Sequence, residues 1–313
     1  MKKIIFTGLF LLSSLAIVSA QVKLSFNPPK GAKYEYQTEM IQISKVSAMG
    51  QDISTEMEMD MKCLMEVVEK TQQEIRVQYT YKDISYIVSS PMMKMGYDSK
   101  KPSENPSDAE KMIGKMFNAL IGKVFSLTIA PNGSIKSVTG MDAMVEDMLQ
   151  SIAADGPAIA MISELMKQMF SESNTKKMFE QSFNFYPGNA VKVGDNWTVD
   201  NELAISNMNT AAKTKYTVKE IKKNMADIAI ESDLEINMAL NLSADVNAKM
   251  DGLLTGAQTG SMLVDTKTGM PISCDVSQNI KGPVKVQGPD NAQKIEMVMD
   301  MTSKTKTSIK DVK

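Results

Sequence analysis

The sequence predicts an α+β fold, in which a long, curved, half-barrel-like antiparallel β-sheet of two related halves carries methionine-rich helices on its apolar face. Three observations predict it. Long segments near both ends alternate between apolar and polar residues, the middle of the chain has apolar residues at helical spacing, and methionine occurs in both patterns. The 28 methionines outnumber all aromatic residues, which is unusual because methionine specifies the shape of a core poorly.

The first 20 residues have the pattern of an export signal. A basic start precedes an apolar run, and Val18 and Ala20 are small enough for signal peptidase to cleave after Ala20. The run is short for a membrane anchor, and no basic cluster follows it. We therefore expect a secreted protein, periplasmic or extracellular, whose mature part, residues 21–313, is one large domain that does not span the membrane.

Strand patterns begin the mature chain, and residues 52–70 show the clearest case. Every second side chain there is one that a core accepts, namely Ile53, Thr55, Met57, Met59, Met61, Cys63, Met65 and Val67. The residues between them are mostly Ser, Glu, Asp and Lys, and we interpret Glu56, Glu58 and Asp60 as part of a solvated face. Alternation of this length is typical of long antiparallel strands with one dry and one wet face.

The middle of the chain changes to helical spacing. Ser107 and Glu110 form a capping box at the start of a first helix, and Gly122 suits its end. Residues 131–133 turn a hairpin, and a short fourth helix is expected near 176–183. Three apolar stripes mark the first three helices: Met112, Ile113, Met116, Phe117, Leu120 and Ile121; Met141, Met144, Val145, Met148, Leu149 and Ile152; Met161, Ile162, Leu165, Met166, Met169 and Phe170.

Strand alternation returns in the second half of the chain. Same-side positions read Ile228, Ile230, Ser232, Leu234, Ile236, Met238, Leu240 and Leu242, and later Ile295, Met297, Met299 and Met301. Residues 64–77 and 217–230 share the order strand, polar turn, strand, which indicates related halves. We expect these halves at about 21–140 and 190–313, with a helical insertion at about 141–183 on one face of the sheet.

The composition excludes several classes of function. Charge is nearly balanced, with 35 Lys and Arg against 37 Asp and Glu, which gives no electrostatic argument for a nucleic-acid partner. Histidine is absent and Arg76 is the only arginine, so imidazole catalysis and His-ligated zinc are excluded. We expect no catalytic residue, no metal and no cofactor.

Cys63 and Cys274 are the only cysteines. An oxidising compartment would permit a disulfide between them, closing a long loop. The other interpretation is two free thiols buried as small hydrophobic groups. The sequence leaves both possibilities open, because it does not define the geometry that a disulfide requires.

Two short motifs suggest chemistry that their context explains more simply. Residues 57–63 hold three thioethers and a thiol, which are ligands that select Cu(I), but an apolar strand face has the same spacing. Ser173–Lys176 and Lys267–Gly269 match the S-x-x-K and K-T-G motifs of penicillin-binding enzymes. The middle motif of that set is missing, and residues 265–269 also fit a hairpin turn with Gly269 in the left-handed conformation.

Several turns and strands resemble those of uncharacterised families of secreted bacterial proteins that are classed only as domains of unknown function. The residues that carry the likeness are "NPPKGAKYEY", "FSLTIAPNGSIKSVTG", "VGDNWTV" and "DTKTGMPIS". A long curved sheet around methionine-rich helices is also similar, in architecture alone, to lipoprotein carriers of the LolA and LppX type. That likeness implies an apolar hollow that holds acyl chains, although a shared fold does not establish a shared function.

Two functions remain open from the sequence. In the first, methionine side chains adapt to a flexible ligand, and the protein binds a lipid or another apolar molecule without catalysis, or assists envelope components. The expected lining of such a cavity is Met57, Met59, Met61, Met116, Met148 and Met166. In the second, the core is filled and exposed strand edges recruit a protein partner.

Overall fold

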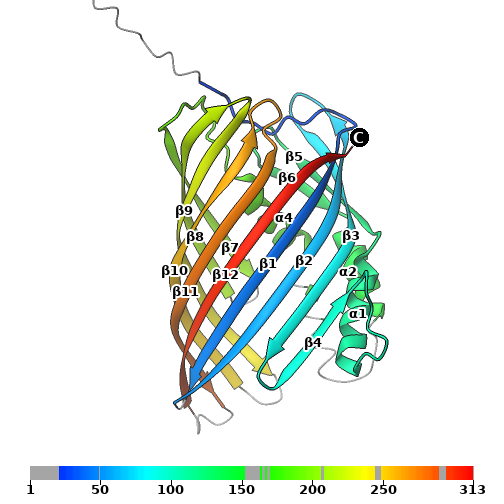
Figure 1. Ribbon diagram of the computed structural model, residues 1–313, viewed down its shortest axis with the longest axis vertical. Helices are drawn as coiled ribbons and strands as arrows, with labels where there is room; N and C mark the ends of the chain where they lie inside the picture. Colours follow the sequence, from blue (N-terminus) through cyan, green and yellow to red (C-terminus); the bar gives the residue numbers. More distant parts are fainter. Residues whose placement is uncertain are drawn as a thin grey trace, which may run out of the picture.

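The computed structural model (Figure 1) describes residues 21–48, 50–151, 163, 166–167, 170–205, 208–243, 248–288 and 294–312. The predicted export signal and most of the predicted third helix lie outside the described residues.

One antiparallel sheet of 12 strands dominates the described chain, as the sequence predicts. Its strands run in the order β6-β5-β3-β2-β1-β12-β11-β10-β9-β8-β7, and β4 pairs with β3 beside β5. The strands are β1 (Lys33–Ala48), β2 (Gln51–Lys70), β3 (Ile75–Ser90), β4 (Met93–Asp98), β5 (Val124–Ile129), β6 (Ile135–Thr139), β7 (Asn196–Ile205), β8 (Met208–Lys222), β9 (Met225–Ser243), β10 (Ala248–Asp265), β11 (Pro271–Gln287) and β12 (Lys294–Val312). The pairing of β1 with β12 joins the first six strands to the last six.

Three helices have described bounds: α1 (Asp108–Leu120), α2 (Met141–Ser151) and α4 (Glu172–Phe183). The capping box of Ser107 and Glu110 is present at the start of α1. α4 begins earlier than the sequence predicts, because Ser171 caps it by accepting a hydrogen bond from the Asn174 N–H. α4 contacts both β6 and β7, so it closes the gap between these two strands of the curved sheet (Figure 1).

The two faces of the sheet differ in polarity. We call the concave face, which includes Tyr36 and Thr38, the inner face, and the opposite face the outer face. Along β1, β2 and β8–β12, the described inner positions are uncharged except for Lys70 and Asp311 at the upper rim. The alternation of apolar and polar residues therefore predicts these two faces correctly, since charged residues occupy the outer positions between the inner ones.

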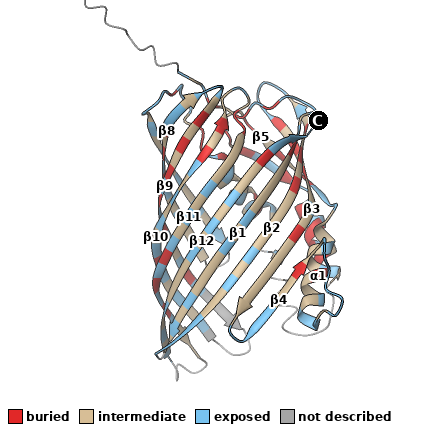
Figure 2. Ribbon diagram, viewed as in Figure 1, coloured by how far each residue is buried: buried red, intermediate tan, exposed pale blue. Residues whose placement is uncertain are grey.

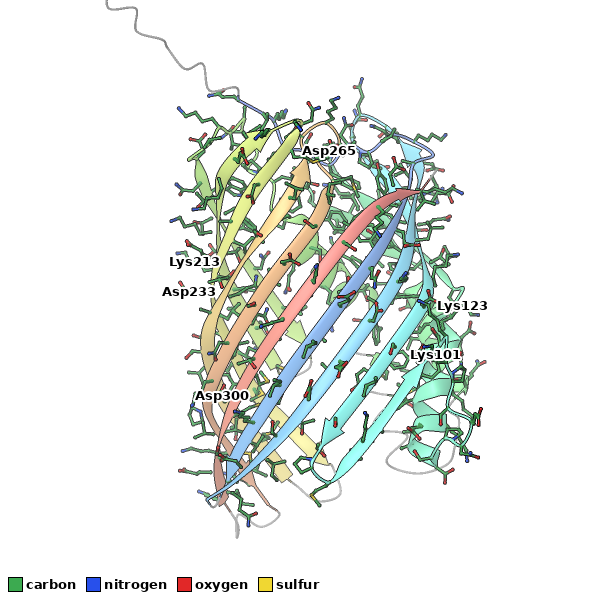
Figure 3. All side chains as sticks on the ribbon, in the orientation of Figure 1. Lys101, Lys123, Lys213, Asp233, Asp265 and Asp300 are labelled. Atoms are coloured by element: carbon green, nitrogen blue, oxygen red, sulfur yellow. The ribbon has the colours of Figure 1, made fainter. Side chains whose placement is uncertain are left out.

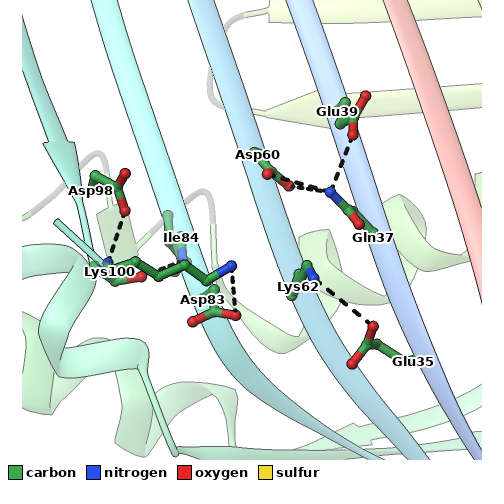
Figure 4. A network of polar contacts seen from close by, with 10 residues as sticks. Glu35, Gln37, Glu39, Asp60, Lys62, Asp83, Ile84, Asp98 and Lys100 are labelled. Atoms are coloured by element: carbon green, nitrogen blue, oxygen red, sulfur yellow. Dashed lines mark hydrogen bonds and ion pairs between the residues drawn. The ribbon is translucent and has the colours of Figure 1, made fainter. Parts of the chain in front are cut away.

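Charged and polar side chains pair with one another on the outer face. Gln37 on β1 donates hydrogen bonds from Nε2 to Glu39 at 3.1 Å and to Asp60 on β2 at 3.3 Å (Figure 4). Lys213 and Asp233, which oppose each other on β8 and β9, project from the outside of the sheet (Figure 3). Exposed pairs of this kind contribute little to stability, but they keep this face solvated.

The N-terminal segment, residues 21–32, covers the upper end of the sheet. The Phe26 N–H donates to the Pro131 carbonyl at 2.8 Å, and the Asn27 N–H donates to the Thr268 carbonyl at 2.7 Å. The Phe26 side chain is fully buried and packs edge-on against the Phe183 ring, with the two ring centroids 5.3 Å apart. Buried residues are therefore concentrated at this end, on the strands and in the covering segments (Figure 2).

Glycines allow the sheet to bend at β10 and β11. Glycine occupies every second inner position of β10, at Gly252, Gly256 and Gly260, and larger residues occupy the inner positions between them. A Cβ atom on Gly256 would lie 1.9 Å from the Asn279 carbonyl oxygen of β11, and one on Gly260 would lie 2.2 Å from the Asp275 carbonyl oxygen. Such close backbone approach is typical of glycine at a bend in a closing sheet.

Candidate functional site: a cavity on the inner face

A cavity of about 560 Å³ lies between the inner face of the sheet and α4. α4 lines it with Met178, Phe179, Gln181 and Ser182. The sheet lines its upper part with Tyr36, Met61, Cys63, Tyr79, Tyr81 and Phe125, and its lower part with Leu234, Ile236 and Ile280. No charged side chain is among the described residues that line it. A volume of this size is within the range of small-molecule binding sites.

Polar side chains cross the inner face in one straight line. Six residues on six neighbouring strands oppose one another directly, and we call them the polar row: Thr214, Ser232, Gln258, Gln278, Ser303 and Gln42. Four of the six, from Thr214 to Gln278, line the cavity. The polar row thus separates an aromatic upper part from a lower part with aliphatic side chains. Leu234 and Ile280 of this lower part belong to a second buried cluster, together with Met238, Leu254 and Val284.

Hydrogen bonds join neighbours along the polar row. The Ser303 hydroxyl donates to Gln278 Oε1 at 3.1 Å, and Gln278 Nε2 donates to Gln258 Oε1 at 2.6 Å. The hydroxyls of Thr214 and Ser232, both about 5% exposed, share a hydrogen bond of 2.9 Å. Polar groups buried on an apolar face need such partners, because an unpaired group loses its bonds to water.

The titratable groups in the upper part of the cavity are neutral at physiological pH. Burial raises the pKa of the Cys63 thiol to about 12 and that of the Cys274 thiol to about 11. Burial also raises the pKa of Tyr216 to about 12, and that of Tyr79 well above its ordinary value. The cavity therefore offers hydroxyl and thiol groups but neither an ionised nucleophile nor a charged acid or base.

These raised pKa values predict slow thiol chemistry. At neutral pH the thiolate fraction of Cys274 is lower by roughly 100-fold than at its ordinary pKa of 9.0, and that of Cys63 is lower still. We expect native protein to react with iodoacetamide at least about 100-fold more slowly than unfolded protein, measured as mass gain over time. A Cys63→Ser variant assigns the remaining reaction to Cys274. Native thiols that reacted at the unfolded rate would contradict this burial.

The two cysteines are free and do not form a disulfide. Cys63 on β2 opposes Tyr36 of β1, and Cys274 on β11 opposes Thr307 of β12, so two whole strands lie between them. Three strand spacings amount to about 14 Å along the sheet, whereas the Cα atoms of a disulfide lie about 6 Å apart. Of the two interpretations of the sequence, the structure therefore agrees with two free thiols rather than with a disulfide.

The structure brings one of the six expected methionines to the cavity, namely Met61. Met57 and Met59 lie on the same inner face of β2 but do not line it. Met148 is buried on α2, Met116 is half-buried on α1, and Met166 is half-buried in a short described stretch. Neither Met116 nor Met148 lines the cavity, because α1 packs on β4 and α2 packs against α1 and α4.

Sequence reasoning missed the polar row and the tyrosines. Part of the polar row has a signal in the sequence, since Ser232 interrupts an apolar run between Ile230 and Leu234, and Gln278 interrupts another between Val276 and Ile280. Its alignment across six strands requires the strand register, which no single run contains. Tyr36 lies in one strand pattern and Tyr79 and Tyr81 in another, so the sequence identifies them only as strand residues.

A second hollow, of about 670 Å³, lies between β4 and α1. Its lining includes the charged residues Lys94, Asp98, Lys101, Glu110 and Lys111. It is more open than the inner cavity and has charged side chains in its lining, so the inner cavity is the better candidate site for an apolar ligand.

The hydrolase motifs have ordinary structural roles. Lys267–Gly269 belong to a turn in which Asp265 Oδ1 accepts hydrogen bonds from the N–H groups of Lys267 and Thr268, and Gly269 has a φ of 68°. Ser173 is exposed in the first turn of α4. The interpretation of residues 265–269 as a turn is therefore confirmed.

Neither a metal site nor a membrane-spanning helix is found among the described residues. No group of three or more His, Cys, Asp or Glu side chains among them could hold a metal ion. None of their helices is long and apolar enough to cross a membrane.

The chain matches the model of a known protein family over more than half of its length. Residues 72–271, from the turn before β3 to the first residue of β11, match the model of a family of unknown function, DUF6263. No curated protein matches the chain. The resemblance to a domain of unknown function is confirmed, and the likeness to LolA and LppX carriers stays a prediction.

Several solved structures match the chain, and their sequences are very different from it. Lipovitellin, described in a structure of lipid–protein interactions, is 10% identical with a TM-score of 0.47, over 91% of this chain and 26% of that chain. The chain thus spans about a quarter of the length of lipovitellin. An outer membrane channel from Pseudomonas putida F1 is 7% identical with a TM-score of 0.25, over 91% of this chain and 98% of that one. OccK7 (OpdD) of Pseudomonas aeruginosa is 7% identical with a TM-score of 0.26, over 90% and 100%.

Proposed function

We propose that this chain, which belongs to the family of unknown function DUF6263, binds an apolar, lipid-like ligand in its inner cavity and does not catalyse a reaction. One observation carries the proposal. The inner face is uncharged between its rims and encloses a cavity, while charged residues occupy the outer face. This distribution suits a protein that shields apolar material from water.

The size of the cavity supports a ligand rather than a packing defect. Protein cores are packed as densely as organic crystals and leave few voids larger than a water molecule. A hollow of about 560 Å³ lined by aromatic and aliphatic side chains is far larger than such voids. Aromatic and aliphatic side chains make up most of its lining and no charged side chain is among the described residues there, so an apolar ligand suits it.

The state of the lining groups supports the proposal that the protein does not catalyse a reaction. Acid–base catalysis needs a group whose pKa lies near the working pH, and nucleophilic catalysis needs an activated nucleophile. Burial instead raises the pKa values of Cys63, Cys274 and Tyr216 to about 11 or 12. We also propose that the protein acts outside the cytoplasm, on the basis of the predicted signal cleaved after Ala20.

Filling the cavity is expected to abolish binding. Ala212 on β8 faces the cavity, whereas its neighbour Ala211 is exposed on the outer face. Ala212→Phe places a ring in the ligand space, and we expect its affinity for the apolar fluorophore N-phenyl-naphthylamine to fall at least about 10-fold. Ala211→Phe adds the same ring outside and is expected to bind as the natural protein does.

The natural ligand is expected to accompany the protein purified from its own cell envelope, as a near-stoichiometric added mass in native mass spectrometry. For the two variants Ala212→Phe and Ala211→Phe, circular dichroism checks that the protein is folded. A bare mass, together with no fluorophore binding by the natural protein, would overturn the proposed function.

The second candidate, a scaffold with a filled core and a long free edge, has less support. β6 and β7, which end the order of strands, both contact α4. β4, which pairs only with β3 among the described strands, is short, at 6 residues. A protein partner that adds a strand needs an accessible edge, and these features limit it.

A further inference from the structure

The polar row is placed where it would meet the middle of a bound ligand. Gln258, Gln278, Ser232 and Thr214 line the cavity between its aromatic upper part and its aliphatic lower part. A purely hydrocarbon ligand would leave these groups facing apolar atoms, which is unfavourable for buried amides. The position of the polar row therefore carries information about the ligand.

Two consecutive hydrogen bonds of the polar row, from Ser303 to Gln258, run in one direction and end in a donor. Ser303 donates to Gln278, which donates to Gln258 Oε1. Gln258 Nε2 has no hydrogen-bond partner among the described residues, so its two N–H groups are available to an acceptor. A chain of bonds that share one direction also polarises its last donor.

The lining restricts the charge of that acceptor. No lysine or arginine is among the described residues that line the cavity, so a carboxylate or phosphate at the polar row would lose its hydration without gaining a cation. No aspartate or glutamate lines it either, which disfavours a cationic ligand in the same way. An uncharged carbonyl satisfies the amide donor without this cost.

From these observations, and resting on the proposed function, we propose that the cavity binds uncharged acyl esters or amides. The carbonyl oxygen accepts a hydrogen bond from Gln258 Nε2, one apolar arm lies against Tyr79 and Phe125, and the other lies against Leu234 and Ile280. Gln278 positions the Gln258 amide, since it donates to Gln258 Oε1 and thereby turns the Gln258 nitrogen away from itself.

Three probes of similar length separate the possibilities: decyl decanoate, which has a central ester; heneicosane, the alkane of equal length; and icosanoate, a carboxylate. Each competes with N-phenyl-naphthylamine for the mature protein, for Gln258→Leu and for Asn279→Leu. Asn279 is exposed on the outer face next to Gln278, so its variant matches the polarity change without touching the cavity. We expect the natural protein and Asn279→Leu to bind the ester about 10-fold more tightly than the alkane.

Gln258→Leu is expected to bind ester and alkane equally, with its alkane affinity unchanged or higher. If the natural protein binds ester and alkane equally, or if Gln258→Leu keeps the ester preference, the inference is wrong while the proposed function stands. Tighter binding of icosanoate than of the ester would also overturn it. Failure of every probe and of the fluorophore would overturn the proposed function itself. Circular dichroism checks that Gln258→Leu is folded. Gln278→Leu, which removes the same hydrogen bond between Gln278 and Gln258, serves as a second variant in case Gln258→Leu does not fold.

Discussion

Raising the pH from 9 to about 11 is expected to unfold the protein in one cooperative step. Burial raises the pKa of seven cysteine and tyrosine side chains above their ordinary values of 9.0 and 10.0: Cys63, Cys274, Tyr36, Tyr79, Tyr81, Tyr186 and Tyr216. In the unfolded chain these groups release protons at their ordinary pKa values, whereas in the folded chain they keep them.

The direction of the effect follows from that difference. Above pH 9 the unfolded state binds fewer protons than the folded state, so the free energy of unfolding falls as the pH rises. Stability is therefore complete below pH 9, and about 1.4 kcal/mol per pH unit is lost for each of the two cysteines above pH 9 and for each of the five tyrosines above pH 10. The seven groups together remove about 10 kcal/mol by pH 11, which is comparable with the whole stability of a typical domain.

The measurement is a titration that follows circular dichroism and tyrosinate absorbance together. Both signals are expected to change at the same pH, because tyrosinate forms when the protein unfolds. Tyr81→Phe removes one buried hydroxyl and is expected to move the midpoint to higher pH. Tyrosinate that appeared gradually from pH 10 with the fold intact would show that water reaches these groups through the cavity, and would contradict their burial.

Gly256→Ala is expected to destabilise the sheet by about 3 kcal/mol or more. The new Cβ atom would lie 1.9 Å from the Asn279 carbonyl oxygen and 2.7 Å from the Ile280 Cα atom, so the β11 backbone must move. That movement would disturb the ladder between β10 and β11 where the sheet bends. The measurement is the free energy of unfolding from urea denaturation.

Gly252→Ala is the matched comparison, because its Cβ would meet the ends of the Val284 and Met238 side chains at 3.0 and 3.1 Å, and its nearest backbone atom, the Pro283 carbonyl oxygen, lies at 3.1 Å rather than at 1.9 Å. Side chains can shift, so we expect a loss of about 1 kcal/mol or less, offset in part by a less flexible unfolded chain. Equal effects at the two glycines would refute the view that Gly256 is required by the β11 backbone.

The sequence predicts the strands and their faces well, because alternation depends only on neighbours along the chain. Met57, Met59 and Met61 all lie on the inner face, as do Ile228 and Met299. The capping box at Ser107 is likewise a local feature, and it is present. Predictions that need only one segment are therefore the ones that succeed.

The contents of the candidate site were harder to predict, because they depend on which strands become neighbours. Met116 and Met148 have the expected helical spacing, yet their helices pack on β4 and on each other rather than over the cavity. Gln258 and Gln278 appear in the sequence as isolated polar residues and become a hydrogen-bonded pair only through the register of β10 and β11. Burial of the tyrosines depends in turn on the segments that close the upper end.

The pairing of β1 with β12 determines when this sheet can be completed. Tyr36 and Ile309 oppose each other although nearly the whole sequence separates them, so the central ladder forms only after the last strand of this sequence is available. Contacts of such long range make folding slow. Until they form, β1 and β11 each expose an unpaired edge of 16 or 17 residues. An emerging chain therefore remains open to pairing with other strands until its last strand has been synthesised and has paired with β1.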